Sequence, residues 1–94
     1  MADISTLVEE EVVVLEDEVL EENKEIILYD DDFNTFDFVI NSLIKVCKHS
    51  AIQAEQCTYI VHYNGKCGVK KGNYAKLKPI CSALLERGLT AEII

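Results

Sequence analysis

The sequence predicts a small α+β domain, a β-α-α-β-α-β sandwich in which three helices cover one face of a three-stranded antiparallel sheet. Three observations lead to this fold class. The chain has 94 residues, which is enough for one compact core but not for two. Short apolar runs of strand type alternate along it with segments of helical period. Since no residues remain for a second helical layer, the helices should cover only one face of the sheet.

The first strand and the first helix are predicted from a change of period. Residues 25–30 (EIILYD) form a short apolar run that ends in acidic residues, which is typical of a buried strand. An apolar stripe of helical spacing follows, made of Phe36, Val39, Ile40, Leu43, Val46 and Cys47. Asn34 is the expected N-cap of this helix, with Asp37 at the capping-box position.

A second helix should begin directly after the first, because Ser50 and Gln53 repeat the capping-box signal. We expect it to end at Asn64–Gly65 and to turn Cys57, Ile60 and Val61 to one face, with Thr58 and His62 on its flank.

The last three elements follow from alternation and from a helical stripe. Residues 66–70 and 89–93 alternate apolar and polar side chains, as half-buried strands do. Between them, a third helix closed by Gly88 is indicated by Leu77, Ile80, Cys81, Leu84 and Leu85. Because proline is favoured in the first turn, the regular helix is expected to begin at Pro79.

The charge is divided unevenly along the chain. The net charge is -8, and residues 1–24 hold nine acidic side chains against one lysine, whereas acids and bases balance in residues 25–94. We therefore expect residues 1–24 to be an acidic flexible extension, either solubilising or functional, and residues 25–94 to be the folded domain. Nucleic acid and membrane are not expected as partners. Without a secretion signal, the chain is expected in the cytoplasm.

The four cysteines, Cys47, Cys57, Cys67 and Cys81, are spaced ten or more residues apart, with no CxxC pair. We interpret them as reduced core residues and expect neither a metal nor another cofactor, a disulfide or zinc site being the weaker alternative. No GxSxG, P-loop, GxGxxG or HExxH motif is present, so an enzyme is not expected. A thiol redox protein is the enzyme class that remains open.

Three successive carboxylates, Asp30 to Asp32, stand between the predicted first strand and first helix. Helix capping and the helix dipole explain one or two acids there, but three repel one another, and a cationic ligand would relieve this repulsion. His62 is an ordinary surface histidine in one interpretation. In the other, its neutral ring accepts a hydrogen bond from an ammonium group.

Two motifs resemble those of the ClpS family of Clp protease adaptors. The run LYDDDFNTFDFVI (residues 28–40) resembles the family pattern LxNDDxTPMEFVI, and VHYNGK (residues 61–66) resembles VHYxGK at the family's separation. The similarity covers residues 25–94. It implies an adaptor that binds N-degrons, which are protein N-termini with a free amine and a bulky first residue (Leu, Phe, Tyr or Trp). The adaptor would deliver these proteins to a Clp-type AAA+ unfoldase, ClpA-like or ClpC-like, and its peptidase.

Carried over residue by residue, the resemblance assigns the binding of the α-ammonium group to Asp30, Asp31 and His62. It assigns the hydrophobic pocket to Asp32, Asn34, Phe36, Thr58, Val61 and Leu89. Asn73 and Lys78 match positions near the unfoldase-docking surface, and a monomer is expected. The flexible N-terminal extension is expected to engage the unfoldase during delivery.

This sequence departs from the family pattern at several of these positions. Asp30 replaces the usual asparagine, Phe36 and Thr58 stand where methionine is common, and Asn73 replaces an acid. The main alternative is a non-catalytic interaction module, similar to the C-terminal domain of the ribosomal stalk protein, that does not read N-termini.

Overall fold

A three-stranded antiparallel sheet carries three helices. The structure is a computed structural model and describes residues 23–94, so the predicted extension lies, apart from its last two residues, outside the described residues. In order, the elements are β1 (Lys24–Tyr29), α2 (Phe36–Cys47), α3 (Ala51–Asn64), β2 (Lys66–Gly72), α4 (Tyr74–Glu86) and β3 (Thr90–Ile93). The predicted fold class and element order are therefore confirmed.

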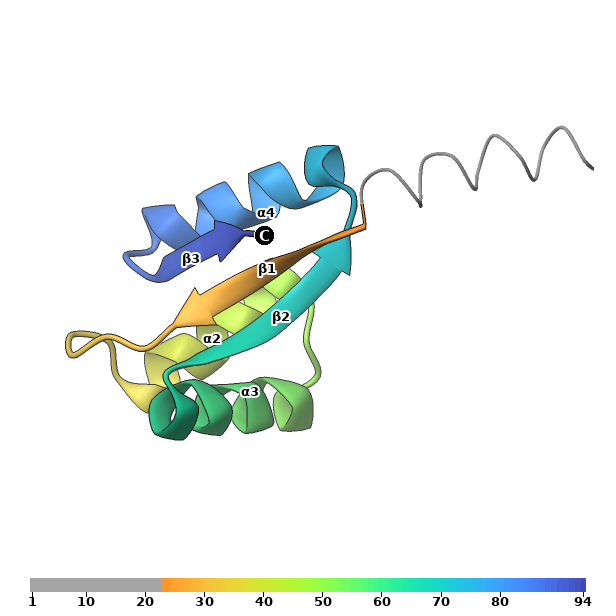
Figure 1. Cartoon of the computed structure of the whole chain (residues 1–94). Coiled ribbons are helices and arrows are strands. Elements are labelled where there is room, and N and C mark those ends of the chain that lie inside the picture. The colour runs from red at the N-terminus through yellow and green to blue at the C-terminus, as the bar shows by residue number, and fades with distance from the viewer. Residues whose placement is uncertain (1–22) are drawn as a thin grey trace, which may run out of the picture.

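The central strand is β1, and the strand order is β2-β1-β3. Figure 1 shows the strands crossing in front of α2 and α4, with α3 alongside β2. Alternate residues of β1, Ile26 and Leu28, are fully buried against the helices. On the open face, the Tyr29 hydroxyl donates to Glu92 Oε1 at 2.5 Å across the β1–β3 pair.

The cap of α2 differs from the prediction by one residue. Thr35, not Asn34, is the N-cap, and its hydroxyl oxygen accepts from the Phe38 N–H at 3.1 Å. Asn34 is not available because its side chain donates to Asp31 and to the Gly88 carbonyl. For α3 the predicted cap is confirmed, since Ser50 Oγ accepts from the Gln53 N–H at 3.1 Å and Gly65 ends the helix at φ 94°.

The predicted faces of α3 are partly wrong. Thr58 is buried together with Ala54 and Val61, whereas Ile60 is 41% exposed. A threonine can lie in the core here because its hydroxyl donates to the Ala54 carbonyl at 2.8 Å, which satisfies the polar group within the helix.

The predicted start of α4 at Pro79 is also wrong. The helix begins at Tyr74, where the Asn73 side chain caps it by accepting from the Lys76 N–H at 2.8 Å. Pro79 lies inside the helix and is exposed. It removes the bond to the Ala75 carbonyl, but Ala75 is exposed too, so water can replace that bond.

Candidate functional site

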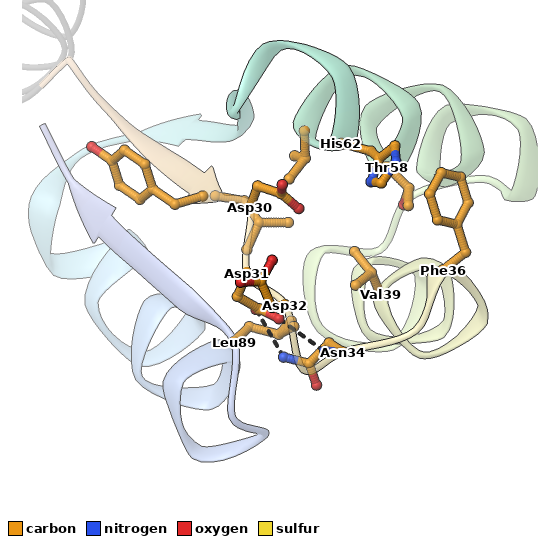
Figure 2. Close-up of a pocket in the computed structure, with 12 residues that line it drawn as sticks. Asp30, Asp31, Asp32, Asn34, Phe36, Val39, Thr58, His62 and Leu89 are labelled. Atoms are coloured by element: carbon orange, nitrogen blue, oxygen red, sulfur yellow. Dashed lines mark hydrogen bonds between the residues drawn. The ribbon is translucent and has the colours of Figure 1, made fainter.

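A hollow of about 270 Å³ opens at the end of the sheet where β1 runs into α2. Figure 2 shows its walls: the aspartates come from the loop after β1, Phe36 and Val39 from α2, Thr58 and His62 from α3, and Leu89 from the turn before β3. We call this hollow the Asp–His pocket. Three segments that are distant in the sequence, residues 28–39, 58–62 and Leu89, therefore meet at one cavity.

The backbone brings Asp30 close to the C-terminal end of α3. The Asp30 N–H donates to the Gly65 carbonyl at 2.9 Å, directly after β1 ends. Gly65 is the C-cap of α3, and His62 lies in the last turn of that helix. This hydrogen bond therefore brings an exposed carboxylate and an exposed imidazole into the lining of the same pocket.

Asp31 organises the loop. Its Oδ1 accepts from the backbone N–H groups of Phe33 and Asn34 at 2.9 and 2.8 Å, and its Oδ2 accepts from Asn34 Nδ2 at 2.9 Å. Burial raises the pKa of this carboxyl, but the hydrogen bonds from Asn34 and Phe33 lower it further, so the pKa lies below its ordinary value. Asp31 is thus a fixed negative charge whose lone pairs are partly used within the loop.

Asn34 links this loop to the turn before β3. Its Nδ2 also donates to the Gly88 carbonyl at 3.0 Å. The next residue, Leu89, is 4% exposed and lines the pocket. The acidic loop and the apolar far wall are therefore held in one arrangement by a single amide.

The remaining surface of the pocket is mainly apolar. Phe36, Val39 and Val61 contribute side chains from the two helices, and Leu28 from the end of β1. Thr58 also lines the pocket, and its hydroxyl is already bonded to the Ala54 carbonyl. Such a surface stabilises an apolar group that leaves water.

Aromatic rings surround His62 at the rim. Its ring centroid lies 5.2 Å from that of Phe36 and 4.9 Å from that of Tyr63, both in edge-on geometry. Phe36 in turn contacts Tyr59 at 5.0 Å. These contacts fix the imidazole on the rim while leaving it exposed.

The structure brings together all nine residues that the sequence predicted for amine binding and for the pocket, although their roles in binding remain predictions. These residues are Asp30, Asp31, Asp32, Asn34, Phe36, Thr58, Val61, His62 and Leu89. Sequence reasoning missed Leu28, Tyr29 and Val39 as lining residues. Val39 was recognisable only as part of the apolar stripe of α2.

The two residues predicted for unfoldase docking lie elsewhere. Asn73 caps α4 and Lys78 is exposed on that helix, and neither lines the Asp–His pocket. Their docking role remains a prediction.

The cysteines are free thiols, and burial raises the pKa of Cys47 to about 11 and that of Cys67 to about 12. Thiols with such pKa values are protonated at neutral pH and therefore weak nucleophiles.

Within residues 23–94, no group of three or more His, Cys, Asp or Glu side chains is placed to hold a metal ion. No helix in this range is long and apolar enough to cross a membrane.

Comparison with known proteins agrees with this geometry. The model of the family described as ATP-dependent Clp protease adaptor protein ClpS matches residues 20–92. An ATP-dependent Clp protease adapter protein ClpS from Nitratidesulfovibrio vulgaris (strain DSM 19637 / Miyazaki F) is 33% identical over 69 residues, which cover 70% of this chain and 69% of that protein. The solved structure of Agrobacterium tumefaciens ClpS2 bound to L-phenylalaninamide has the same fold, with a TM-score of 0.66 at 20% identity, over 78% of this chain and 95% of the other.

Proposed function

This chain belongs to the ClpS family of ATP-dependent Clp protease adaptor proteins, and from this premise we propose that it binds N-degrons in the Asp–His pocket and delivers them to a Clp unfoldase. An N-degron offers a free α-ammonium group and a bulky apolar first side chain. The single observation that carries the proposal is that one cavity presents carboxylates and a histidine beside an apolar wall.

The acidic side of the pocket suits an α-ammonium group. Asp30 offers an exposed carboxylate, Asp31 adds a fixed negative charge, and His62 offers a ring nitrogen that can accept a hydrogen bond. An ammonium group has three hydrogens to donate and is bound best by acceptors that carry negative charge. An acetylated terminus has no positive charge and fewer hydrogens, so it gains little here.

The apolar side suits a large first side chain. Enclosing such a side chain fully contributes roughly 1.5–3 kcal/mol. L-Phenylalaninamide, the ligand bound to the Agrobacterium protein, carries both groups, a free α-amine and a phenyl ring. The cavity of about 270 Å³ supports binding of a group of this kind in the present chain as well.

Asp30 changes the balance of the pocket relative to the family pattern. A carboxylate cannot donate to a substrate carbonyl as the usual asparagine amide can, but it adds negative charge near the amine. We expect the affinity of this protein to depend more on the charge of the terminus and less on the carbonyl that follows.

The partner follows from the family: a Clp protease, with a ClpA-like or ClpC-like unfoldase and its peptidase. Asn73 and Lys78 are the proposed contact residues on α4. The protein acts as a monomer in the cytoplasm and has no catalytic activity of its own in this proposal.

Reconstituted degradation tests the proposal. A reporter protein that begins with Phe should be degraded by the Clp unfoldase and peptidase much faster when the full chain is present, whereas the same reporter beginning with Ala should not respond. The variant His62→Ala should abolish the acceleration. Equal acceleration of both reporters, or an undiminished effect of His62→Ala, contradicts the proposal.

A further inference from the structure

A second hollow lies near the opposite end of the sheet and carries the opposite charge. It has a volume of about 380 Å³ and is lined by four lysines and one carboxylate among its side chains. We call it the lysine hollow and define it by Lys48, Lys70, Lys71, Lys76, Glu25 and His49. Lys48, Lys71 and Lys76 are exposed, so their ammonium groups are accessible.

His49 forms a buried part of the wall of the lysine hollow. It is 6% exposed, and one ring nitrogen, Nε2, lies 2.7 Å from the Val69 carbonyl oxygen. Since a carbonyl only accepts, Nε2 carries the hydrogen. The other nitrogen, Nδ1, is buried and has no partner among residues 23–94. Because Nε2 carries the hydrogen, Nδ1 is an acceptor, and only a donor such as a water molecule or a backbone N–H could satisfy it.

The chain itself provides an anionic segment beside this hollow. Residues 1–22 contain nine of the seventeen acidic side chains and no lysine or arginine. They join the fold at Asn23, and in the first pairs of β1 Lys24 lies opposite Gly72 and Glu25 opposite Lys71. Glu25 and Lys71 both line the lysine hollow, so the acidic segment enters the domain at its edge.

We propose that the lysine hollow is the docking site for the acidic segment of residues 1–22 of the same chain. Only Asn23 and Lys24 separate the segment from Glu25 in the hollow, so its effective concentration there is high and even a weak contact is populated. Attraction between carboxylates and exposed lysines of this kind weakens as salt screens it.

The charge arrangement of the whole domain agrees with this assignment. The three carboxylates of the Asp–His pocket follow β1, whereas the acidic segment precedes it, and Figure 1 shows these two ends of the strand at opposite ends of the sheet. The acidic segment is thus repelled from the substrate pocket and attracted to the lysine hollow. This inference does not depend on the proposed reading of N-degrons.

Nuclear magnetic resonance of the full chain tests the proposal. The amide shifts of residues 1–22 are compared with those of the free peptide of the same sequence, at low salt and then from about 0.05 M to about 0.5 M NaCl. We expect clear differences at low salt that disappear as salt rises. The double variant Lys71→Gln/Lys76→Gln should remove most of these differences at low salt.

A matched control uses two exposed lysines outside the hollow. Lys45→Gln/Lys66→Gln removes the same charge and should leave the shifts of residues 1–22 unchanged. Core amide shifts report whether each variant remains folded. The proposal is overturned if residues 1–22 of the wild-type chain match the free peptide at low salt, or if both double variants have the same effect. It is equally overturned if an unrelated polyglutamate perturbs the hollow while the chain's own segment does not.

Discussion

Asn34 and Gly88 are joined beside the Asp–His pocket, where the Asn34 side-chain amide donates to the Gly88 carbonyl at 3.0 Å. The same Nδ2 donates to Asp31 Oδ2 at 2.9 Å. The carboxylate side and the Leu89 side of the pocket are therefore coupled by one side chain, although 54 residues separate its two ends in the sequence.

Asn34→Ala should loosen the pocket without unfolding the domain. It removes two hydrogen bonds of about 1 kcal/mol each, so peptide affinity should fall by up to roughly 30-fold. Asn34→Asp should lower the peptide affinity further, because it places a carboxylate next to the Asp31 carboxylate and the Gly88 carbonyl. Calorimetric titration with a Phe peptide measures this order, and equal affinities for the three proteins contradict the coupling.

The loop should respond to acid in a predictable direction. The pKa of Asp31 is lowered in the folded state, so its hydrogen bonds contribute stability above the pKa of the unfolded chain and are lost as the pH falls through the folded value. A pH titration of the Phe33 and Asn34 amide resonances should give a midpoint below the ordinary value of 3.8. A midpoint at or above 3.8 means that these bonds do not form.

The two histidines should separate binding from stability. His62 is exposed on the pocket rim, so His62→Ala should weaken a Phe peptide about 10- to 100-fold while changing the free energy of unfolding by less than about 0.5 kcal/mol. His49 is buried and bonded to Val69, so His49→Ala should cost roughly 1–3 kcal/mol of stability. Peptide titration and thermal unfolding of both variants check this, and the opposite pattern refutes the placement of His62.

Thr58 should set the size limit of the pocket. Thr58→Met replaces a small side chain in the pocket wall with a longer one that reduces the space for a ligand, so a Trp peptide should lose roughly tenfold in affinity while a Leu peptide changes little. Thr58→Val keeps the volume and serves as the matched control. If Met and Val affect the Trp peptide equally, the hydroxyl rather than the volume matters.

Residues 1–22 should act in delivery rather than in binding. The described lining of the pocket lies between Leu28 and Leu89, so deletion of residues 1–22 should leave the affinity for a Phe peptide within about twofold. The rate of degradation of a Phe-starting reporter should fall. Equal degradation rates with the truncated and the full chain contradict this role.

The order of elements could be predicted because each signal is local. Apolar periodicity marked β1 and α2, and the Ser50–Gln53 cap marked the start of α3. The errors arose where tertiary contacts override local preference. Asn34 has the chemistry of an N-cap, but it bonds to Gly88 instead, and Pro79 lies inside α4 because Asn73 caps the helix further upstream.

Most of the pocket residues could be predicted from two motifs, and Thr58 and Leu89 from the wider family resemblance, but their geometry could not. The hydrogen bond from Asp30 to Gly65 joins the two motifs, and no local pattern reports it. The lysine hollow was not predicted at all, since its members come from β1, β2, α4 and the turn between α2 and α3, and the lysine charges are balanced by acids elsewhere in the domain.

Calorimetric titration of the full chain with one Phe-starting peptide, with either a free or an acetylated N-terminus, tests the central claim most directly. Acetylation removes the charge that Asp30, Asp31 and His62 are proposed to bind and leaves the phenyl ring unchanged. We expect the free peptide to bind and the acetylated peptide to show no measurable binding. Affinities within about twofold of each other would contradict the claim, because each 1.4 kcal/mol of lost interaction corresponds to about a tenfold change.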